Sequence, residues 1–109
     1  MKKADKLNNL MTLLGASESD SALLQLYLDQ AREEILIWLF SNTTEDYTEY
    51  DLPQKYDWTQ INACIAGFNM IGAEGEASHS ENGISRTFKY SDMVDYIHSH
   101  VYPYIGTPE

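Results

Sequence analysis

An apolar stripe in the segment DSALLQLYLDQAREEILIWLFS, residues 20–41, constrains the fold more than any other feature of this sequence. Its apolar residues recur at spacings of three and four, which is the period of an α-helix with one buried face. Ser19 or Asp20 can cap the start of such a helix. The pattern therefore predicts one long amphipathic helix, whose stripe consists of Leu24, Leu28, Ala31, Ile35, Trp38 and Leu39.

The same segment carries more apolar surface than one stripe requires. Leu23, Leu26, Ile37 and Phe40 lie off the stripe, whereas the middle of the segment is polar and charged. A four-helix chain of 109 residues cannot easily cover this additional surface with its own side chains. We therefore expect part of the long helix to contact another subunit.

Two further segments have helical patterns on either side of the long helix. Residues 4–14 form a short amphipathic helix that Gly15 can end, and residues 54–71 form a third helix that Gly72 and Gly75 can stop. The apolar faces consist of Leu7, Leu10, Met11 and Leu14 in the first case, and of Trp58, Ile61, Cys64, Ile65, Phe68 and Ile71 in the second.

The remainder of the chain combines a Gly/Ser-rich segment with a last helix. Residues 72–88 are rich in Gly and Ser, and Ile84–Tyr90 alternates partly between apolar and polar residues, which favours a short extended piece. A helix then runs from a Ser91–Asp92 cap to about residue 102, before Pro103. We predict an all-α fold, a small helical bundle of about four helices with a long Gly/Ser loop or a short extended arm between the last two.

The composition limits the domain count and the class of partner. One domain over residues 1–109 is expected, with a helical core over 1–102 and a tail over 103–109. The net charge is −10 and only seven residues are Lys or Arg. Since phosphate neutralisation needs clustered cations, nonspecific nucleic-acid binding is not expected. No apolar run approaches the roughly 20 residues of a membrane span, so we expect a soluble, cytosolic chain without a membrane partner.

The residue patterns give no catalytic or metal-binding site. His98 and His100 are two residues apart, whereas a metal pair on a helix needs a spacing of three or four. The sequence SHSE at 78–81 includes the residue types of a hydrolase triad, but a triad is assembled from separate elements. Cys64 lies on an apolar helix face and is interpreted as a small hydrophobe. We predict a non-enzymatic protein without cofactor or metal ion.

The segment FNMIGAEGEASHSENGISRTF, residues 68–88, is the most specific part of the sequence. A helix ends in an Asn-x-x-Gly-x-Glu-Gly unit, which is followed by a Ser-rich stretch and then by Gly-Ile-Ser-Arg and an aromatic residue. This signature, and the order of helices over nearly the whole chain, resembles the small head-tail connector (adaptor) proteins of tailed phages. The loop signature consists of Asn69, Gly72, Glu74, Gly75 and Gly83.

The resemblance implies a structural virion protein without catalytic activity. It implies a closed ring of about twelve copies beneath the portal of a DNA-filled head. Such a ring connects the portal protein to a stopper or tail-completion protein and lets double-stranded DNA pass without specific binding. The expected location is the head-tail interface of the virion, after assembly in the host cytoplasm.

Two groups of residues are candidate contacts in such an assembly. Ile84–Tyr90 is expected to dock as an extended arm, and the alternative is that it folds back onto its own core. The tail residues Tyr102, Tyr104 and Ile105 are expected to grip the portal, with a frayed terminus as the alternative. The self-assembly or partner contact comprises Leu23, Leu26, Ile37, Phe40, Ile84, Ser85, Arg86, Thr87, Phe88 and Tyr90.

A rival function is an acidic DNA mimic that inhibits a host DNA-binding protein. Its carboxylates should lie on one face with the spacing of phosphates, whereas here they are scattered among helix faces and loops. The Gly/Ser signature would also be unexplained. A regulatory or scaffolding interaction protein is a further alternative, and the connector is the favoured interpretation.

Overall fold

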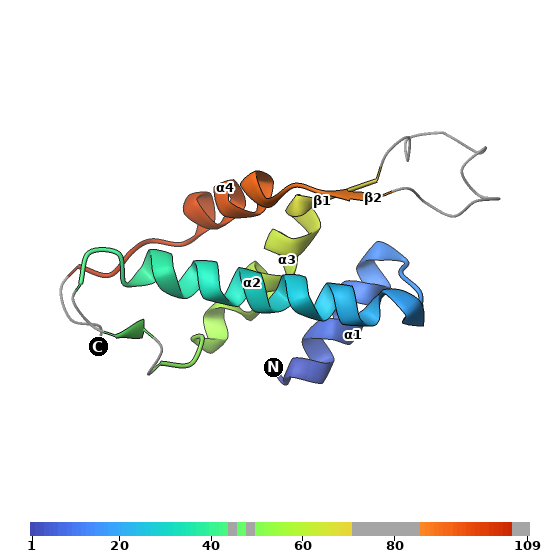
Figure 1. Ribbon diagram of the computed structural model, residues 1–109. Coiled ribbons are helices and arrows are strands. Elements are labelled where there is room, and N and C mark those ends of the chain that lie inside the picture. The colour runs from blue at the N-terminus through green and yellow to red at the C-terminus, as the bar shows by residue number, and fades with distance from the viewer. Residues whose placement is uncertain (44–45, 48–49, 71–85, 106–109) are drawn as a thin grey trace.

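The computed structural model describes residues 1–43, 46–47, 50–70 and 86–105. Within these ranges the chain forms four α-helices, two short 3-10 helices and one pair of three-residue strands. The long helix α2 (Ser21–Leu39) runs through the molecule, with α1 (Lys3–Leu14) and α4 (Tyr90–His100) on different sides of it (Figure 1). The predicted all-α fold of about four helices is thus confirmed.

The corner between α1 (Lys3–Leu14) and α2 is fixed by local backbone chemistry. Gly15 has a φ of 65°, in the left-handed region that glycine adopts without steric cost. The 3-10 helix η1 (Glu18–Asp20) then leads directly into α2. Asp20 accepts a hydrogen bond from the backbone N–H of Ser17 at 3.2 Å, as part of a capping box at the start of η1. Asp20 thus takes part in a cap, but the first residue of that cap, Ser17, lies four residues before the first residue of α2.

The predicted stripe of α2 forms the centre of the core. Leu24, Leu28, Ala31, Ile35 and Leu39 are all at most 1% exposed, and Trp38 is half-buried at their edge. They pack against α1, α3 (Asp57–Gly67) and α4 (Tyr90–His100), each of which contacts α2. The helical period of the sequence therefore identifies the buried face correctly.

The third helix is shorter than the sequence predicts, which is a correction. Instead of one helix over 54–71, the chain forms the 3-10 helix η3 (Gln54–Tyr56), then α3, and then the strand β1 (Phe68–Met70). The helix ends at Gly67 because Lys89 donates its backbone N–H to the Gly67 carbonyl oxygen.

The strand β2 (Arg86–Phe88) pairs with β1 in antiparallel register. Phe68 lies opposite Phe88, and Met70 lies opposite Arg86. An extended piece is thus present at 86–88, and its partner is a segment of the same chain. The pair projects from the end of α3 and the start of α4 (Figure 1).

The last helix, α4, packs mainly against α3 and also contacts α2. It starts after Lys89, so the predicted cap at Ser91–Asp92 lies inside its first turn, and it ends two residues before residue 102. Met93, Ile97 and Val101 are at most 1% exposed. Among the residues that the structure describes, no helix combines the length and apolar character of a membrane span.

Candidate interaction surfaces

An exposed apolar face runs along α2. Leu23 is 45% exposed, Leu26 is 56% exposed and Ile37 is 43% exposed. Leu26 and Ile37 are eleven residues apart, which is about three helical turns, and Leu23 and Ile37 are about four turns apart. All three therefore project from one side of the helix, away from the buried stripe. We call this set the outer α2 face.

Phe40 does not belong to that face. It is only 7% exposed, because the ring of Tyr50 lies 4.8 Å away and the ring of Tyr104 lies 5.2 Å away. A hydrogen bond of 2.8 Å, from the backbone N–H of Tyr104 to the Leu39 carbonyl oxygen, holds Tyr104 beside Phe40. Phe40 therefore packs inside its own chain and exposes little surface for the subunit contact that the sequence predicts for it.

Phe88 anchors β2 to the core of the chain. Its ring stacks on Tyr27 of α2 at a centroid distance of 3.9 Å and an interplanar angle of 10°. Phe68 meets Tyr27 edge-on at 5.5 Å, so three aromatic rings hold the base of the β1–β2 pair. Tyr90, the first residue of α4 and two residues after Phe88, is 42% exposed.

The other residues of the expected arm and loop are only partly described. Arg86 and Thr87 belong to the strand β2, and Asn69 belongs to the strand β1. The expected contact residues Ile84 and Ser85 lie outside the described residues. The same holds for the loop signature residues Gly72, Glu74, Gly75 and Gly83.

The segment after α4 is bound to α2 at its first residue, Val101, and the residues that follow include large exposed side chains. Trp38 donates its indole N–H to the Val101 carbonyl oxygen at 2.7 Å. Tyr104 is half-buried on Phe40, whereas Tyr102 is 80% exposed and Ile105 is 93% exposed. The side chains of Tyr102 and Ile105 are thus exposed to solvent, while hydrogen bonds to α2 hold the backbone at Val101 and Tyr104.

His98, His100 and Cys64 all pack against other side chains of the chain. His98 stacks on Trp38 at a centroid distance of 3.9 Å, and His100 stacks on Tyr96 at the same distance. Cys64 is fully buried, and burial raises the pKa of its thiol to about 12. At neutral pH it is therefore a protonated hydrophobe, as the sequence suggested.

Two polar side chains of α3 are buried, which the sequence analysis did not anticipate. Asp57 is 5% exposed, and its carboxylate lies 3.1 Å from Lys6 Nζ and 2.8 Å from the N-terminal ammonium. Burial raises the pKa of Asp57, but the hydrogen bonds from the N-terminal ammonium and from Lys6 outweigh it and hold the pKa below its usual value. Gln60 is 3% exposed.

Comparison with known proteins identifies the family of this chain. The model of the family described as phage gp6-like head-tail connector protein matches residues 5–104. Comparisons with curated proteins and with solved structures gave no match. The matched range includes most of α1 and all of α2, α3 and α4, and proteins of this family are structural components that join the phage head to its tail. The chain therefore belongs to the phage gp6-like head-tail connector protein family.

Proposed function

We propose that this chain forms a ring of about twelve copies beneath the portal of a DNA-filled head. The ring binds the portal protein on one side and a stopper or tail-completion protein on the other. The observation that carries this proposal is the outer α2 face: Leu23, Leu26 and Ile37 are all more than 40% exposed on one side of one helix.

The outer α2 face can supply the contact between neighbouring copies. Complete burial of a Leu or Ile side chain contributes about 1.5–3 kcal/mol, so covering three half-exposed side chains contributes roughly 2–4 kcal/mol. A closed ring uses heterologous contacts, in which this face of one copy meets a different surface of the next. Tyr90, at the exposed start of α4, extends the apolar surface available for such contacts.

The segment from residue 84 to 90 is proposed as a second contact. Because β2 pairs with β1 along one edge, only its other edge can accept a strand from a neighbouring copy. The stacking of Phe88 on Tyr27 fixes the position of this edge relative to α2.

The tail is the proposed portal contact. Tyr102 and Ile105 are the most exposed large hydrophobic side chains of the described chain, and the hydrogen bond from Trp38 to Val101 fixes the backbone before them. An anchored base reduces the entropy lost on docking. Deletion of residues 103–109 is expected to reduce the amount of protein bound to portal-containing heads, measured by pull-down. Unchanged binding would contradict this role of the tail.

The acidic composition is compatible with DNA passage. At a net charge of −10 the chain repels phosphates, so DNA can pass a ring of such chains without adhering to it. The DNA mimic remains the second candidate, but two of its carboxylates are engaged by cations of the same chain. Asp57 is buried against Lys6, and Asp29 is paired with Lys3.

The decisive experiment is the copy number of this chain in purified virions, measured by quantitative mass spectrometry against the portal protein. A ratio of about one to one is expected for a ring that matches the portal ring. Absence of the chain from virions, despite its expression in infected cells, would overturn the connector function and favour the DNA mimic.

A further inference from the structure

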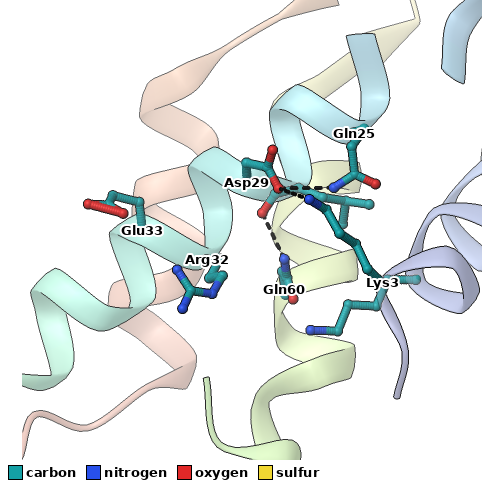
Figure 2. Close-up of a pocket in the computed structure, with 8 residues that line it drawn as sticks. Lys3, Gln25, Asp29, Arg32, Glu33 and Gln60 are labelled. Atoms are coloured by element: carbon teal, nitrogen blue, oxygen red, sulfur yellow. Dashed lines mark hydrogen bonds and ion pairs between the residues drawn. The ribbon is translucent and has the colours of Figure 1, made fainter. Parts of the chain in front are cut away.

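A polar recess of about 360 Å³ lies between α1, α2 and α3 (Figure 2). Its walls carry three cations, Lys3, Lys6 and Arg32, and two carboxylates, Asp29 and Glu33. The rest of the chain has only four of the seven Lys and Arg residues but 15 of the 17 Asp and Glu residues. Because Lys6 is paired with Asp57, Lys3 and Arg32 are the two cations of the recess that remain for another partner, on a molecule that is otherwise strongly acidic.

Gln60 gives this recess an unmet hydrogen-bonding requirement. Its amide Nε2 donates to the Leu28 carbonyl oxygen at 2.7 Å, which fixes the orientation of the amide group. Its Oε1 is buried and has no hydrogen-bond partner in the part of the chain that the structure describes. A buried acceptor without a donor costs about 1–3 kcal/mol. An external N–H or O–H group would remove this cost.

Two of the cations can bind an additional anion. Lys3 Nζ lies 3.8 Å from Asp29 Oδ1, and the Lys3 side chain is 72% exposed, so this ion pair is weak and Lys3 can move at little cost. Arg32 donates from Nη2 to the Tyr50 carbonyl oxygen at 3.3 Å. A guanidinium group has five N–H donors, so Arg32 can also bind a carboxylate.

In Figure 2 the Gln60 amide reaches the recess from α3, between Arg32 of α2 and Lys3 of α1. Gln60 and the two available cations thus line the same recess. A ligand that satisfies all three must present a negative charge and, beside it, a hydrogen-bond donor. A peptide segment with an Asp or Glu side chain has both, since its backbone carries N–H groups.

We propose that the recess binds a carboxylate-bearing peptide segment of a second copy of this chain. The carboxylate contacts Lys3 and Arg32, and a donor of the same segment binds Gln60 Oε1. Charge complementarity favours this occupant, because every neighbour in a ring carries the same net charge of −10. The inference rests on the proposed self-assembly and adds a polar contact to the apolar one of the outer α2 face.

A matched pair of charge reversals tests the cationic part of the site. Lys3→Glu places a negative charge in the recess, and Lys55→Glu makes the same change at an exposed lysine that lies outside both the recess and the proposed contact segment 84–90. Self-association of the full chain is measured by sedimentation velocity at low ionic strength. Lys3→Glu is expected to weaken self-association roughly tenfold and Lys55→Glu less than about twofold, because of these two lysines only Lys3 faces the bound carboxylate.

Gln60→Met tests the hydrogen-bonding part of the site. The substitution keeps the approximate size of the side chain and removes the buried acceptor. The melting temperature of the monomer is expected to stay unchanged or rise, while self-association weakens roughly 3- to 10-fold. A purely structural role of Gln60 would instead lower the melting temperature and leave association as in the wild type.

Three outcomes would overturn the inference. These are equal association of Lys3→Glu and Lys55→Glu, unchanged association of Gln60→Met, and a wild-type chain that stays monomeric up to about 1 mM. A Lys3→Glu chain that self-associates normally but no longer binds heads would assign the recess to another partner. In each case, wild-type copies in virions at about one per portal subunit would leave the connector function intact.

Discussion

Gly67→Ala is the substitution whose effect follows most directly from the structure. A Cβ added at residue 67 would lie 2.8 Å from Cε2 of Phe88 and 3.0 Å from the Lys89 carbonyl oxygen. Both distances are shorter than normal van der Waals contacts. Neither neighbour moves freely, because Phe88 is stacked on Tyr27 and Lys89 is bound to residue 67 through its backbone N–H.

The size of the effect is the difference between two contributions. Overpacking of a well-packed site costs about 1–3 kcal/mol. Replacing Gly by Ala at a position of negative φ stabilises by about 0.4–1 kcal/mol, because the unfolded chain loses conformational freedom. Gly67 is not among the residues of positive φ, so both contributions apply. We expect a net loss of about 1–2 kcal/mol, which lowers the melting temperature by roughly 5–10 °C.

Thermal unfolding followed by far-UV circular dichroism measures this loss, and Phe88→Ala provides the matched background. If the Phe88 ring causes the clash, Gly67→Ala should destabilise the Phe88→Ala chain less than it destabilises the wild type. A melting temperature of Gly67→Ala equal to or above that of the wild type would refute the reasoning. It would mean that β2 and the start of α4 can shift without cost.

Three further substitutions or treatments have defined outcomes. Leu26→Ser combined with Ile37→Ser should reduce the number of copies per virion severalfold while the melting temperature of the monomer changes little, because both side chains are exposed in the monomer. Leu13→Ser is the control, because Leu13 is 57% exposed and lies on α1, outside the outer α2 face. Asp57→Asn should destabilise the chain by about 1–3 kcal/mol at neutral pH, measured by urea unfolding. Because the pKa of Asp57 is lowered in the folded state, the stabilisation by its carboxylate is present above the usual pKa of a carboxyl group and is lost as the pH falls through the lower folded-state pKa. The difference in free energy of unfolding between the wild type and Asp57→Asn should therefore shrink in acid, and a constant difference would contradict this. Cys64 should react with thiol reagents only after unfolding, and rapid labelling of the native chain at neutral pH would contradict its burial.

The helices themselves could be predicted from the sequence because they depend on local spacing. The stripe of α2 shows a helical period over its whole length, and the structure buries five of its six members fully. The surplus residues Leu23, Leu26 and Ile37 are exposed for the same reason, since one helix cannot bury all its sides in a four-helix chain. Local patterns were sufficient where local geometry determined the outcome.

The errors arose where distant segments meet. Phe40 lies off the predicted stripe, as Ile37 does, but it is buried because the rings of Tyr50 and Tyr104 pack on it at the end of α2. The third helix ends at Gly67 rather than near residue 71 because β2 pairs with the residues that follow it. Neither contact has a local sequence signal, since each depends on how chain segments far apart in the sequence come together.

The buried polar residues of α3 did have a signal in the sequence. Asp57, Gln60, Ile61 and Cys64 occur at positions i, i+3, i+4 and i+7, so two polar residues share one helical stripe with two apolar ones. The predicted apolar face of the third helix includes Trp58 instead, which is 51% exposed in the structure. A stripe through residues 57, 60, 61 and 64 would have predicted that Asp57 and Gln60 are buried.

A polar side chain within a buried stripe needs a partner, and the two residues differ in where they find it. Asp57 obtains its partner from the same chain, because α1 brings Lys6 to within 3.1 Å of its carboxylate. Within the part of the chain that the structure describes, Gln60 has a partner only on its nitrogen side, the Leu28 carbonyl oxygen. The neighbouring cations Lys3 and Arg32 are held by long contacts of 3.8 Å and 3.3 Å. An unfilled acceptor beside weakly held cations is expected of a surface whose remaining partners arrive on assembly, which is why the recess and the outer α2 face are best tested together in the same association experiment.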